Sequence, residues 1–353
     1  MPEVLARLCK DLGNGTFQCL VCPHRCVIPP GATGICGMRE NRGGKLVLLS
    51  YGKVSSIGID PVMKKPLYHF WPNHLTYSIA SVGCNFRCPW CQNWPISQTT
   101  IKNYSWHLRH MDPELVVEEA KSYGCMSISY TYNEPIIWFE YVVDVAKLAK
   151  REGLMNILVT NGYATDEALD ELCKYIDAAN VDWKAFREEV YSKYIKARLE
   201  PVLHATKEMK RRGLHIEITY LIIPTVNDNF DDIRKMCKYI VDELGPDTPL
   251  HFSRFYPEYR FLDVEPTPVQ VLEKACEIAR EEGIKFVYIG NVPGHRYEHT
   301  YCPECGKRLI ARFGFEILEW NLREDMTCPE CGAKIPIVGR YVVPPKRPLY
   351  GVF

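Results

Sequence analysis

The chain has 353 residues, of which 46% are hydrophobic, and this length suits one large α/β domain with smaller appendages. Its 43 basic residues balance 43 acidic residues, so the formal net charge is zero and a broad nucleic-acid surface is not expected. No stretch approaches the roughly 18 consecutive apolar residues of a membrane span, and the first residues lack the pattern of a secretory signal.

The 16 cysteines are an unusual feature of the composition. Most of them fall into three groups whose short spacings are typical of metal sites rather than of a secreted disulfide framework. The groups are Cys19, Cys22, Cys26 and Cys36; Cys84, Cys88 and Cys91; and Cys302, Cys305, Cys328 and Cys331. So many thiols favour a reducing compartment, and we expect a cytoplasmic protein.

Residues 1–50 are rich in glycine and cysteine and are expected to form an N-terminal metal-binding module. Their four cysteines have the spacing C-x2-C-x3-C-x9-C, and His24 could replace one of them as a ligand. Zinc is favoured over a second Fe–S cluster, because nothing nearby in the sequence indicates electron transfer. A loop without metal is the remaining alternative.

From residue 51 to residue 295, strand-like apolar runs alternate with amphipathic helical segments. The predicted strands are Tyr77–Val82, Met126–Tyr130, Met155–Val159, Ala179–Trp183, Ile216–Ile223, Leu250–Phe255 and Phe286–Ile289. The predicted helices are Asp112–Tyr123, Ile137–Glu152, Asp166–Ile176, Pro201–Arg212, Asp231–Leu244 and Pro268–Glu282. Repeated βα units predict an α/β fold with a parallel sheet, here an open, partial (β/α)6 TIM-like barrel. In such folds the chemistry gathers at the C-terminal ends of the strands.

The segment SVGCNFRCPWCQN follows the first predicted strand and places Cys84, Cys88 and Cys91 at the spacing C-x3-C-x2-C. Thiolates at this spacing can hold three irons of a [4Fe–4S] cluster, which normally takes four cysteines. The missing ligand leaves one iron open to bind a small molecule and deliver an electron to it. The alternatives are a zinc site completed by a distant ligand and three unligated thiols.

Polar motifs follow the next two predicted strands. The segment SYTYNEP offers Asn133 and Glu134, although Asn133 is also a suitable helix N-cap. The segment LVTNGY offers Thr160 and Asn161 in an Asn-Gly turn, which is also an ordinary strand terminator. Both pairs are therefore candidate site residues with a structural alternative.

Two charges in the segment NVDWKAF, Asp182 and Lys184, alternate to the same side of the fourth predicted strand. A surface ion pair is the alternative, but two charges at the end of an otherwise apolar strand favour a functional role. His251 and Asn291 are weaker candidates near the last two strands, since a lone histidine on a strand is more often a packed core residue.

Residues 296–353 are expected to form a C-terminal module around two CPEC segments. The resulting C-x2-C…C-x2-C pattern is typical of a zinc ribbon, in which four thiolates stabilise a piece of chain too small for its own core. The module is either purely structural or also a docking surface for a protein partner.

The three-cysteine loop, with Trp90 directly before its third cysteine, closely resembles the signature of the radical S-adenosylmethionine (SAM) superfamily. The resemblance implies that a reduced [4Fe–4S] cluster cleaves SAM to a 5′-deoxyadenosyl radical, which takes a hydrogen atom from the substrate. It implies that Glu134, with Asn133 beside it, contacts the amino group of SAM. It also implies a catalytic role for the three cysteines and for Lys184, which would bind the carboxylate of SAM while Asp182 faces the amino or sulfonium side.

Other segments resemble the activases of glycyl radical enzymes. LVTNGY is similar to their DTNG stretch, but Val159 stands in the place of the acidic residue, so Thr160 and Asn161 would substitute for it. VDWKAF is similar to their D-x-K motif. The resemblance also implies that His251 reaches SAM or substrate and that Asn291 lies near the adenosine.

Nearly the whole chain resembles this activase-like branch, and the group most similar to it is that of the AmmeMemoRadiSam system radical SAM enzymes. The segments that carry the likeness are the N-terminal cysteine loop, DPVMKKPLYHFWP, GCNFRCPWCQN, YNEP, VDWKAF, HFSRFYP, YIGNV and the C-terminal ribbon. The resemblance implies a protein or peptide substrate, with Memo-like or AMMECR-like proteins as partners, and a ferredoxin or flavodoxin as electron donor. The alternatives are a radical SAM enzyme acting on RNA or a small metabolite, and a non-catalytic Fe–S and zinc-ribbon scaffold.

Overall fold

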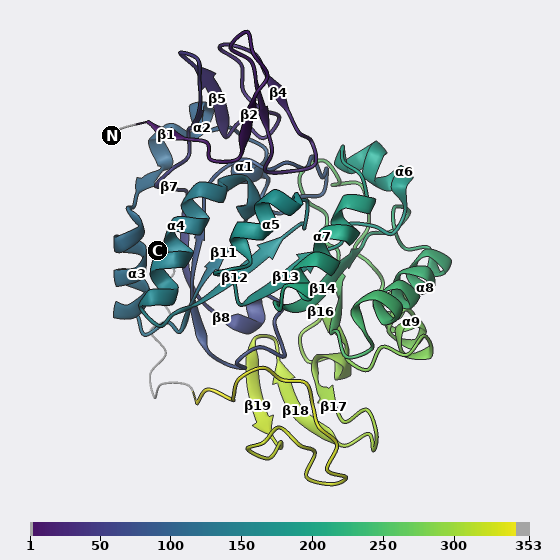
Figure 1. Ribbon diagram of the computed structural model, residues 1–353. Helices are drawn as coiled ribbons and strands as arrows, with labels where there is room; N and C mark the ends of the chain where they lie inside the picture. Colours follow the sequence, from purple (N-terminus) through teal and green to yellow (C-terminus); the bar gives the residue numbers. More distant parts are fainter. Residues whose placement is uncertain (1–2, 344–353) are drawn as a thin grey trace.

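The computed structural model describes residues 3–343, and its centre is an eight-stranded sheet of order β16-β15-β14-β13-β12-β11-β9-β8 (Figure 1). Neighbouring strands from β9 to β16 run parallel, whereas β8 pairs antiparallel with β9 at one edge. The strands are β8 Ser56–Pro61, β9 Leu75–Ala80, β11 Ser127–Tyr130, β12 Met155–Thr160, β13 Ala178–Asp182, β14 His215–Ile222, β15 Leu250–Arg254 and β16 Val287–Gly290. Since β16 and β8 do not pair with each other, the sheet stays open and the predicted partial barrel is confirmed.

A helical crossover joins each pair of consecutive parallel strands. The helices of this part are α1 Trp94–Ser97, α2 Ile101–Tyr104, α3 Pro113–Ser122, α4 Phe139–Arg151, α5 Asp166–Leu172, α6 Glu188–Val190, α7 Glu200–Arg211, α8 Phe230–Tyr239 and α9 Val269–Glu281. The crossover helices pack against the strands (Figure 1), which explains why β11 is buried along its whole length. The predicted helix that ends at Leu244 closes with a π-helical turn, Ile240–Leu244, after α8.

The N-terminal segment forms short strands that end before β8. They are β1 Val4–Leu5, β2 Cys9–Asp11, β3 Phe17–Cys19, β4 Val27–Ile28, β5 Arg39–Arg42, β6 Lys45–Leu48 and β7 Lys53–Val54, which pairs with β10 Arg109–His110. At the opposite end of the molecule in Figure 1, β17 Thr300–Tyr301, β18 Arg308–Phe313 and β19 Glu316–Trp320 form a three-stranded sheet. A shared core joins this C-terminal sheet to the barrel, because Leu309 and Ile310 belong to the same buried cluster as Ile157 and Phe286.

A buried ion pair attaches the N-terminal strands to the barrel. The guanidinium of Arg39 in β5 donates to the Glu140 carboxylate in α4 at 2.5 Å and to the carbonyl of Ile137 at 2.8 Å. Both charged side chains are almost completely excluded from solvent. A buried pair of this kind is costly to break, because the remaining charge has no water to compensate for its lost partner.

We expect Glu140→Gln to lower the free energy of unfolding by about 3–5 kcal/mol, since it leaves the Arg39 charge buried and unpaired. The matched control is Glu152→Gln, which removes an exposed carboxylate 2.7 Å from Lys121 and is expected to cost at most about 1 kcal/mol. Urea unfolding followed by circular dichroism measures both. Equal effects of the two substitutions would contradict the prediction.

Candidate active site

A cavity of about 550 Å³ opens at the C-terminal ends of the parallel strands. It is lined by every predicted site residue of the barrel except His251, namely Cys84, Cys88, Trp90, Cys91, Asn133, Glu134, Thr160, Asn161, Asp182, Lys184 and Asn291. These residues come from the loops after β9, β11, β12, β13 and β16, except that Thr160 and Asp182 are the last residues of β12 and β13. The parallel topology therefore brings together groups that are up to about two hundred residues apart in the sequence.

The thiols of Cys84, Cys88 and Cys91 line the same cavity, but they do not converge on a single point. Burial raises the pKa of the Cys88 thiol to about 12, and the neighbouring thiol of Cys91 adds to this effect while Lys184 opposes it. Burial likewise raises the pKa of Cys84, and the Glu134 carboxylate and the thiols of Cys88 and Cys91 add to the rise. Within residues 3–343, however, only the C-terminal cysteines have sulfur atoms that all lie within 4.8 Å of one another.

Three sulfur atoms that do not all lie within 4.8 Å of one another fit a multi-iron cluster better than a single metal ion. In a [4Fe–4S] cluster each thiolate binds a different iron, so the sulfurs stay farther apart than the ligands of one zinc ion. Two polar groups lie at hydrogen-bond distance from the loop sulfurs: the N–H of Phe86 donates to the Cys84 sulfur at 3.3 Å, and the hydroxyl of Ser97 lies 3.1 Å from the Cys91 sulfur. The donor set is therefore suited to such a cluster.

Glu134 is held rigidly between the ends of β11 and β12. Its carboxylate accepts hydrogen bonds from the Thr160 hydroxyl at 2.7 Å, the Asn161 N–H at 2.8 Å and the Ile136 N–H at 2.9 Å. Burial raises the pKa of this carboxyl to about 7, although the three hydrogen bonds and the charge of Lys184 oppose the rise. The site thus contains a fixed carboxylate whose charge is costly without a cationic partner.

The N-cap of the 3₁₀ turn Pro135–Trp138 is Glu134, whose side chain accepts from Ile136, and not Asn133 as the capping alternative proposed. Asn133 instead accepts from the N–H of Ser81 at 3.2 Å and donates to the carbonyl of Gly83 at 3.0 Å. It therefore fixes the backbone that leads into the three-cysteine loop.

Asp182 and Lys184 form an ion pair on the wall of the cavity, not on the open surface. Burial opposes the charge of Lys184, but Asp182 and the thiols of Cys88 and Cys91 outweigh it and raise the pKa of Lys184. One carboxylate oxygen of Asp182, Oδ1, is buried without a hydrogen-bond partner in the described chain. An unused acceptor beside a lysine suits a ligand that carries both a cation and a carboxylate.

His251 lies in a different cluster. Its Nε2 is 2.7 Å from the Glu217 carboxylate, its ring stacks on Tyr288, and it does not line the cavity. Glu217 also accepts the N–H of His69 at 2.7 Å and that of Tyr68 at 3.0 Å. The packing alternative thus describes His251 better than the proposed contact with SAM or substrate.

Sequence reasoning missed several residues that line the cavity, including Lys65 and Phe315. The ammonium of Lys65 donates to Asp60 at 2.6 Å and lies 4.4 Å from the centre of the Tyr132 ring. The segment DPVMKKP could have indicated Lys65, because a buried lysine needs a charged or polar partner and Asp60 lies in the same segment. Phe315, in the turn between β18 and β19, gave no local signal because only docking of the C-terminal sheet brings it to the cavity.

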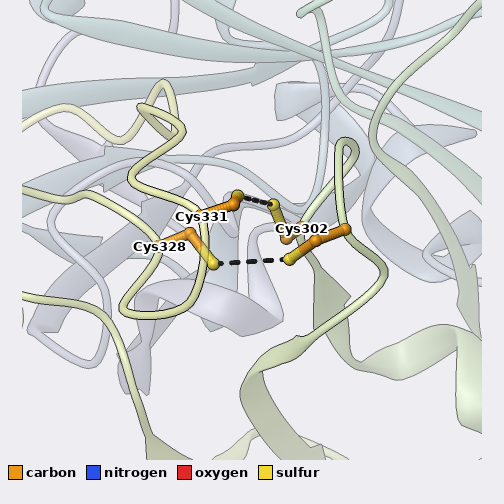
Figure 2. A group of neighbouring side chains, drawn as sticks. Cys302, Cys328 and Cys331 are labelled. Atoms are coloured by element: carbon orange, nitrogen blue, oxygen red, sulfur yellow. Dashed lines mark hydrogen bonds between the residues drawn. The ribbon is translucent and has the colours of Figure 1, made fainter.

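The four C-terminal cysteines form a compact group that can hold one metal ion. The Cys302 and Cys331 sulfurs are 3.5 Å apart and the Cys305 and Cys328 sulfurs are 3.7 Å apart. Figure 2 shows Cys328 and Cys331 on one loop facing Cys302 on another. Four convergent thiols match tetrahedral coordination. The regular structure described in this module is one small sheet and the 3₁₀ turn Arg296–Glu298, so a metal would add to the core that the module shares with the barrel.

We expect Cys328→Ser to abolish metal binding in this module and to unfold its sheet while the barrel stays folded. The measurement combines the metal content of the purified protein with limited proteolysis of the C-terminal region. Cys173→Ser, which changes a cysteine outside the three groups, is the control and should retain the metal. Full metal content in Cys328→Ser would contradict this role.

The fold and the site together define a class of barrel enzyme whose cluster-binding loop follows the first parallel strand. Residues 78–240 match the family model described as Radical SAM superfamily. An uncharacterized protein of Methanocaldococcus jannaschii is 47% identical over 330 residues, which cover 93% of this chain and 98% of that protein.

Further relatives carry functional names. A putative glycyl-radical enzyme activating enzyme of M. jannaschii is 28% identical over 61% of this chain and 78% of its own length. The pyruvate formate-lyase 1-activating enzyme of Escherichia coli is 23% identical over 58% of this chain and 89% of its own length. A solved radical SAM methyltransferase from Sphaerobacter thermophilus superposes with a TM-score of 0.47 at 17% identity, over 63% of this chain and 68% of the other.

Residues 78–240 form a domain of the radical SAM superfamily, and the relatives named as activating enzymes support its activase-like branch. Membership makes it an enzyme of radical SAM type and implies a [4Fe–4S] cluster and SAM as cofactors. No helix among residues 3–343 has the length and apolar character that crossing a bilayer requires.

Proposed function

We propose that the protein cleaves SAM reductively and takes a hydrogen atom from a protein or peptide substrate. The observation that carries this proposal is that one cavity holds the three loop thiols, the buried Glu134 carboxylate and the Asp182–Lys184 pair. A cluster bound by the three thiols would supply the electron that splits the sulfonium of SAM and yields the 5′-deoxyadenosyl radical.

The remaining groups of the cavity each have a task that follows from their position. Glu134 accepts hydrogen bonds from the ammonium of SAM, and Lys184 donates to its carboxylate, as charge-assisted pairs in a largely dry site. The free Oδ1 of Asp182 is available to the ammonium or the sulfonium. Trp90, which is packed against Tyr194 and Phe261, shields the loop from water.

The names of the activating-enzyme relatives support a macromolecular substrate. So does Phe315, which lines the cavity from a hairpin that also exposes Phe313 and Leu318. Memo-like or AMMECR-like proteins are the proposed partners, and a ferredoxin or flavodoxin in the cytoplasm is the proposed electron donor. Residues 1–50, 51–295 and 296–353 are the proposed modules, with zinc in the last of them.

The substrate class is tested by isotope transfer. A Memo-like or AMMECR-like partner is produced fully deuterated and mixed with the reduced, reconstituted enzyme and unlabelled SAM. Deuterium in the 5′-deoxyadenosine supports hydrogen abstraction from the protein. Unlabelled 5′-deoxyadenosine formed at the same rate with and without these partners would contradict it and direct attention to RNA or small metabolites, while no 5′-deoxyadenosine under any condition would favour the scaffold alternative.

The affinity for SAM is expected to rise with pH. Burial raises the pKa of Glu134 from its ordinary 4.5 to about 7, so at acid pH the carboxyl is protonated and offers no charge to the ammonium of SAM. Because the pKa is raised in the folded chain, this carboxyl favours the folded state most below pH 4.5, and that contribution is lost as the pH rises through about 7. A bound ammonium favours the ionised form of Glu134 over the protonated form. Binding of SAM should therefore release a proton from this carboxyl.

Isothermal titration calorimetry in two buffers with different ionisation enthalpies measures this proton release. We expect release near neutral pH in the native protein and none in Glu134→Gln. An affinity that stays constant between about pH 6 and 8 would rule out Glu134 as the partner of the ammonium.

A further inference from the structure

The N-terminal cysteine group lies directly against the radical SAM loop. The Nε2 atom of His24 is 2.8 Å from the carbonyl oxygen of Asn85, the residue after Cys84. On the other side, the Arg87 guanidinium donates to the carbonyl of Ile35, the residue before Cys36. The two cysteine-bearing loops are therefore joined by hydrogen bonds on both sides.

The contact is closest between Cys36 and Gly83. Gly83 has a φ of +82°, and a Cβ atom built on it would lie 2.7 Å from the carbonyl oxygen of Cys36. Only glycine allows this approach, because any side chain would collide with the backbone of the N-terminal loop. The backbone at Cys36 thus packs on the residue that precedes the first loop cysteine, Cys84.

The four N-terminal cysteines are also close to one another in space. The N–H of Cys19 donates to the carbonyl of Cys26 at 2.9 Å, and the N–H of Ile35 lies 3.5 Å from the Cys26 sulfur. A Cβ atom built on Gly34, two residues before Cys36, would lie 3.7 Å from the Cys26 sulfur. The four cysteines are therefore neighbours in space, as their spacing in the sequence suggests.

Their sulfurs nevertheless do not converge as those of the C-terminal group do. Zinc holds each sulfur at about 2.3 Å and so draws four of them to within roughly 4 Å of one another. Among residues 3–343 only Cys302, Cys305, Cys328 and Cys331 meet the looser limit of 4.8 Å. No three of the N-terminal thiols lie within that limit, and neither do the three thiols of the radical SAM loop, which argues against the zinc that the sequence favoured.

The N-terminal module contains a buried hydrogen-bond donor that has no partner in the described chain. The Nε of Arg39 has none in the described chain, although the other end of the guanidinium is bonded to Glu140 and Ile137. The backbone carbonyl of Arg39 accepts the N–H of Gly34 at 3.1 Å, so Arg39 is held at the loop that carries Cys26 and Cys36. N–H donors of this kind bind the sulfurs of Fe–S clusters and tune their reduction potentials.

We propose that Cys19, Cys22, Cys26 and Cys36 bind a second Fe–S cluster, which relays electrons to the cluster on the radical SAM loop. The relay, unlike the cluster itself, rests on the proposed function. In each transfer the N-terminal cluster gives up one electron and the radical SAM cluster accepts it, without a proton or a bond change. A low-potential one-electron donor protein, of the ferredoxin or flavodoxin type, reduces the N-terminal cluster again.

The cluster is tested without changing the N-terminal site. The variant with Cys84, Cys88 and Cys91 all replaced by alanine is purified without oxygen, and its iron, sulfide and zinc are measured together with its Mössbauer spectrum. We expect roughly four irons per chain, with a [4Fe–4S] spectrum that does not change when SAM is added. Zinc in place of iron, or no metal beyond the C-terminal module, would overturn the proposal.

A failure of the proposed function would be seen separately, in the native protein. There the radical SAM cluster should change its electron paramagnetic resonance spectrum when SAM is added, whatever the N-terminal site contains. If SAM causes no change but the triple variant still holds a cluster, the proposed function fails and the second cluster stands.

The relay is tested by the kinetics of reduction. Stopped-flow mixing with reduced flavodoxin is compared between the native chain and a variant with the four N-terminal cysteines replaced by serine. We expect the variant to lose the fast reduction of the radical SAM cluster, while reduction by titanium(III) citrate, which is small enough to act directly, is retained. Equal rates with flavodoxin would overturn the relay.

If the serine variant does not fold, magnetic coupling in the native chain replaces this comparison. Two reduced clusters held in adjoining loops should broaden each other's resonance signals, relative to the signal of the triple alanine variant. The absence of broadening in the fully reduced native protein would overturn the relay.

Discussion

Replacing any one of Cys84, Cys88 and Cys91 by alanine is expected to abolish the formation of 5′-deoxyadenosine. Each thiolate would hold a different iron, so none can take over the role of another, and the chain offers no fourth cysteine within this loop. The experiment uses anaerobically reconstituted protein, a strong reductant and SAM, with the nucleoside measured by liquid chromatography and mass spectrometry. This is the substitution with the largest expected effect on activity.

The control for this experiment is Cys173→Ala, which removes a cysteine outside the three groups and should keep full activity. Circular dichroism of every variant separates loss of the cluster from loss of the fold. Native activity in any one of the three loop variants, with a correctly folded chain, would show that the thiol concerned is not a cluster ligand. That result would return the loop to the zinc or unligated alternatives.

Glu134→Gln is expected to raise the KM for SAM about tenfold to a hundredfold, which corresponds to the loss of one charge-assisted hydrogen bond. The substitution keeps the size of the side chain but removes the charge that faces the ammonium of SAM. A glutamine still accepts through one oxygen, whereas the native carboxylate accepts from Thr160, Asn161 and Ile136. Some loss of stability is therefore expected as well.

Steady-state assays of SAM cleavage over a range of SAM concentrations separate these effects. The control is Glu167→Gln, which changes a more exposed carboxylate 2.8 Å from Arg25 and should leave the KM unchanged. A role of Glu134 in folding alone would lower the yield or the melting temperature without changing the KM. An unchanged KM in folded Glu134→Gln would therefore refute the assigned contact.

The position of Asn133 illustrates the limit of local patterns. The sequence placed it at the right strand end, but reading it as an N-cap failed because the adjacent Glu134 reaches Ile136 and performs the capping. Which of two neighbouring polar side chains caps a turn depends on where the other strands are. Here the amide of Asn133 forms hydrogen bonds with the N–H of Ser81 and the carbonyl of Gly83, which lie 52 and 50 residues away in sequence.

The sequence by itself determined the features that depend on the short spacing of cysteines and on the periodic pattern of apolar residues. The C-x3-C-x2-C loop, the paired CPEC segments and the alternation of strand and helix are all local, and the parallel sheet then requires the polar strand ends to meet at one edge. For this reason Glu134, Asp182 and Lys184 could be placed in one cavity before the fold was known.

Only the tertiary structure decided the features that depend on distant segments packing together. It placed His251 with Glu217, brought Phe315 from the C-terminal hairpin to the cavity, and paired Arg39 with Glu140. The tertiary structure also decided the distances between the sulfur atoms. The spacing of cysteines in the sequence gives the number of possible ligands, but it does not give the distances between them. These distances follow from how neighbouring segments hold the backbone of each loop, as Gly83 packs against the backbone of Cys36.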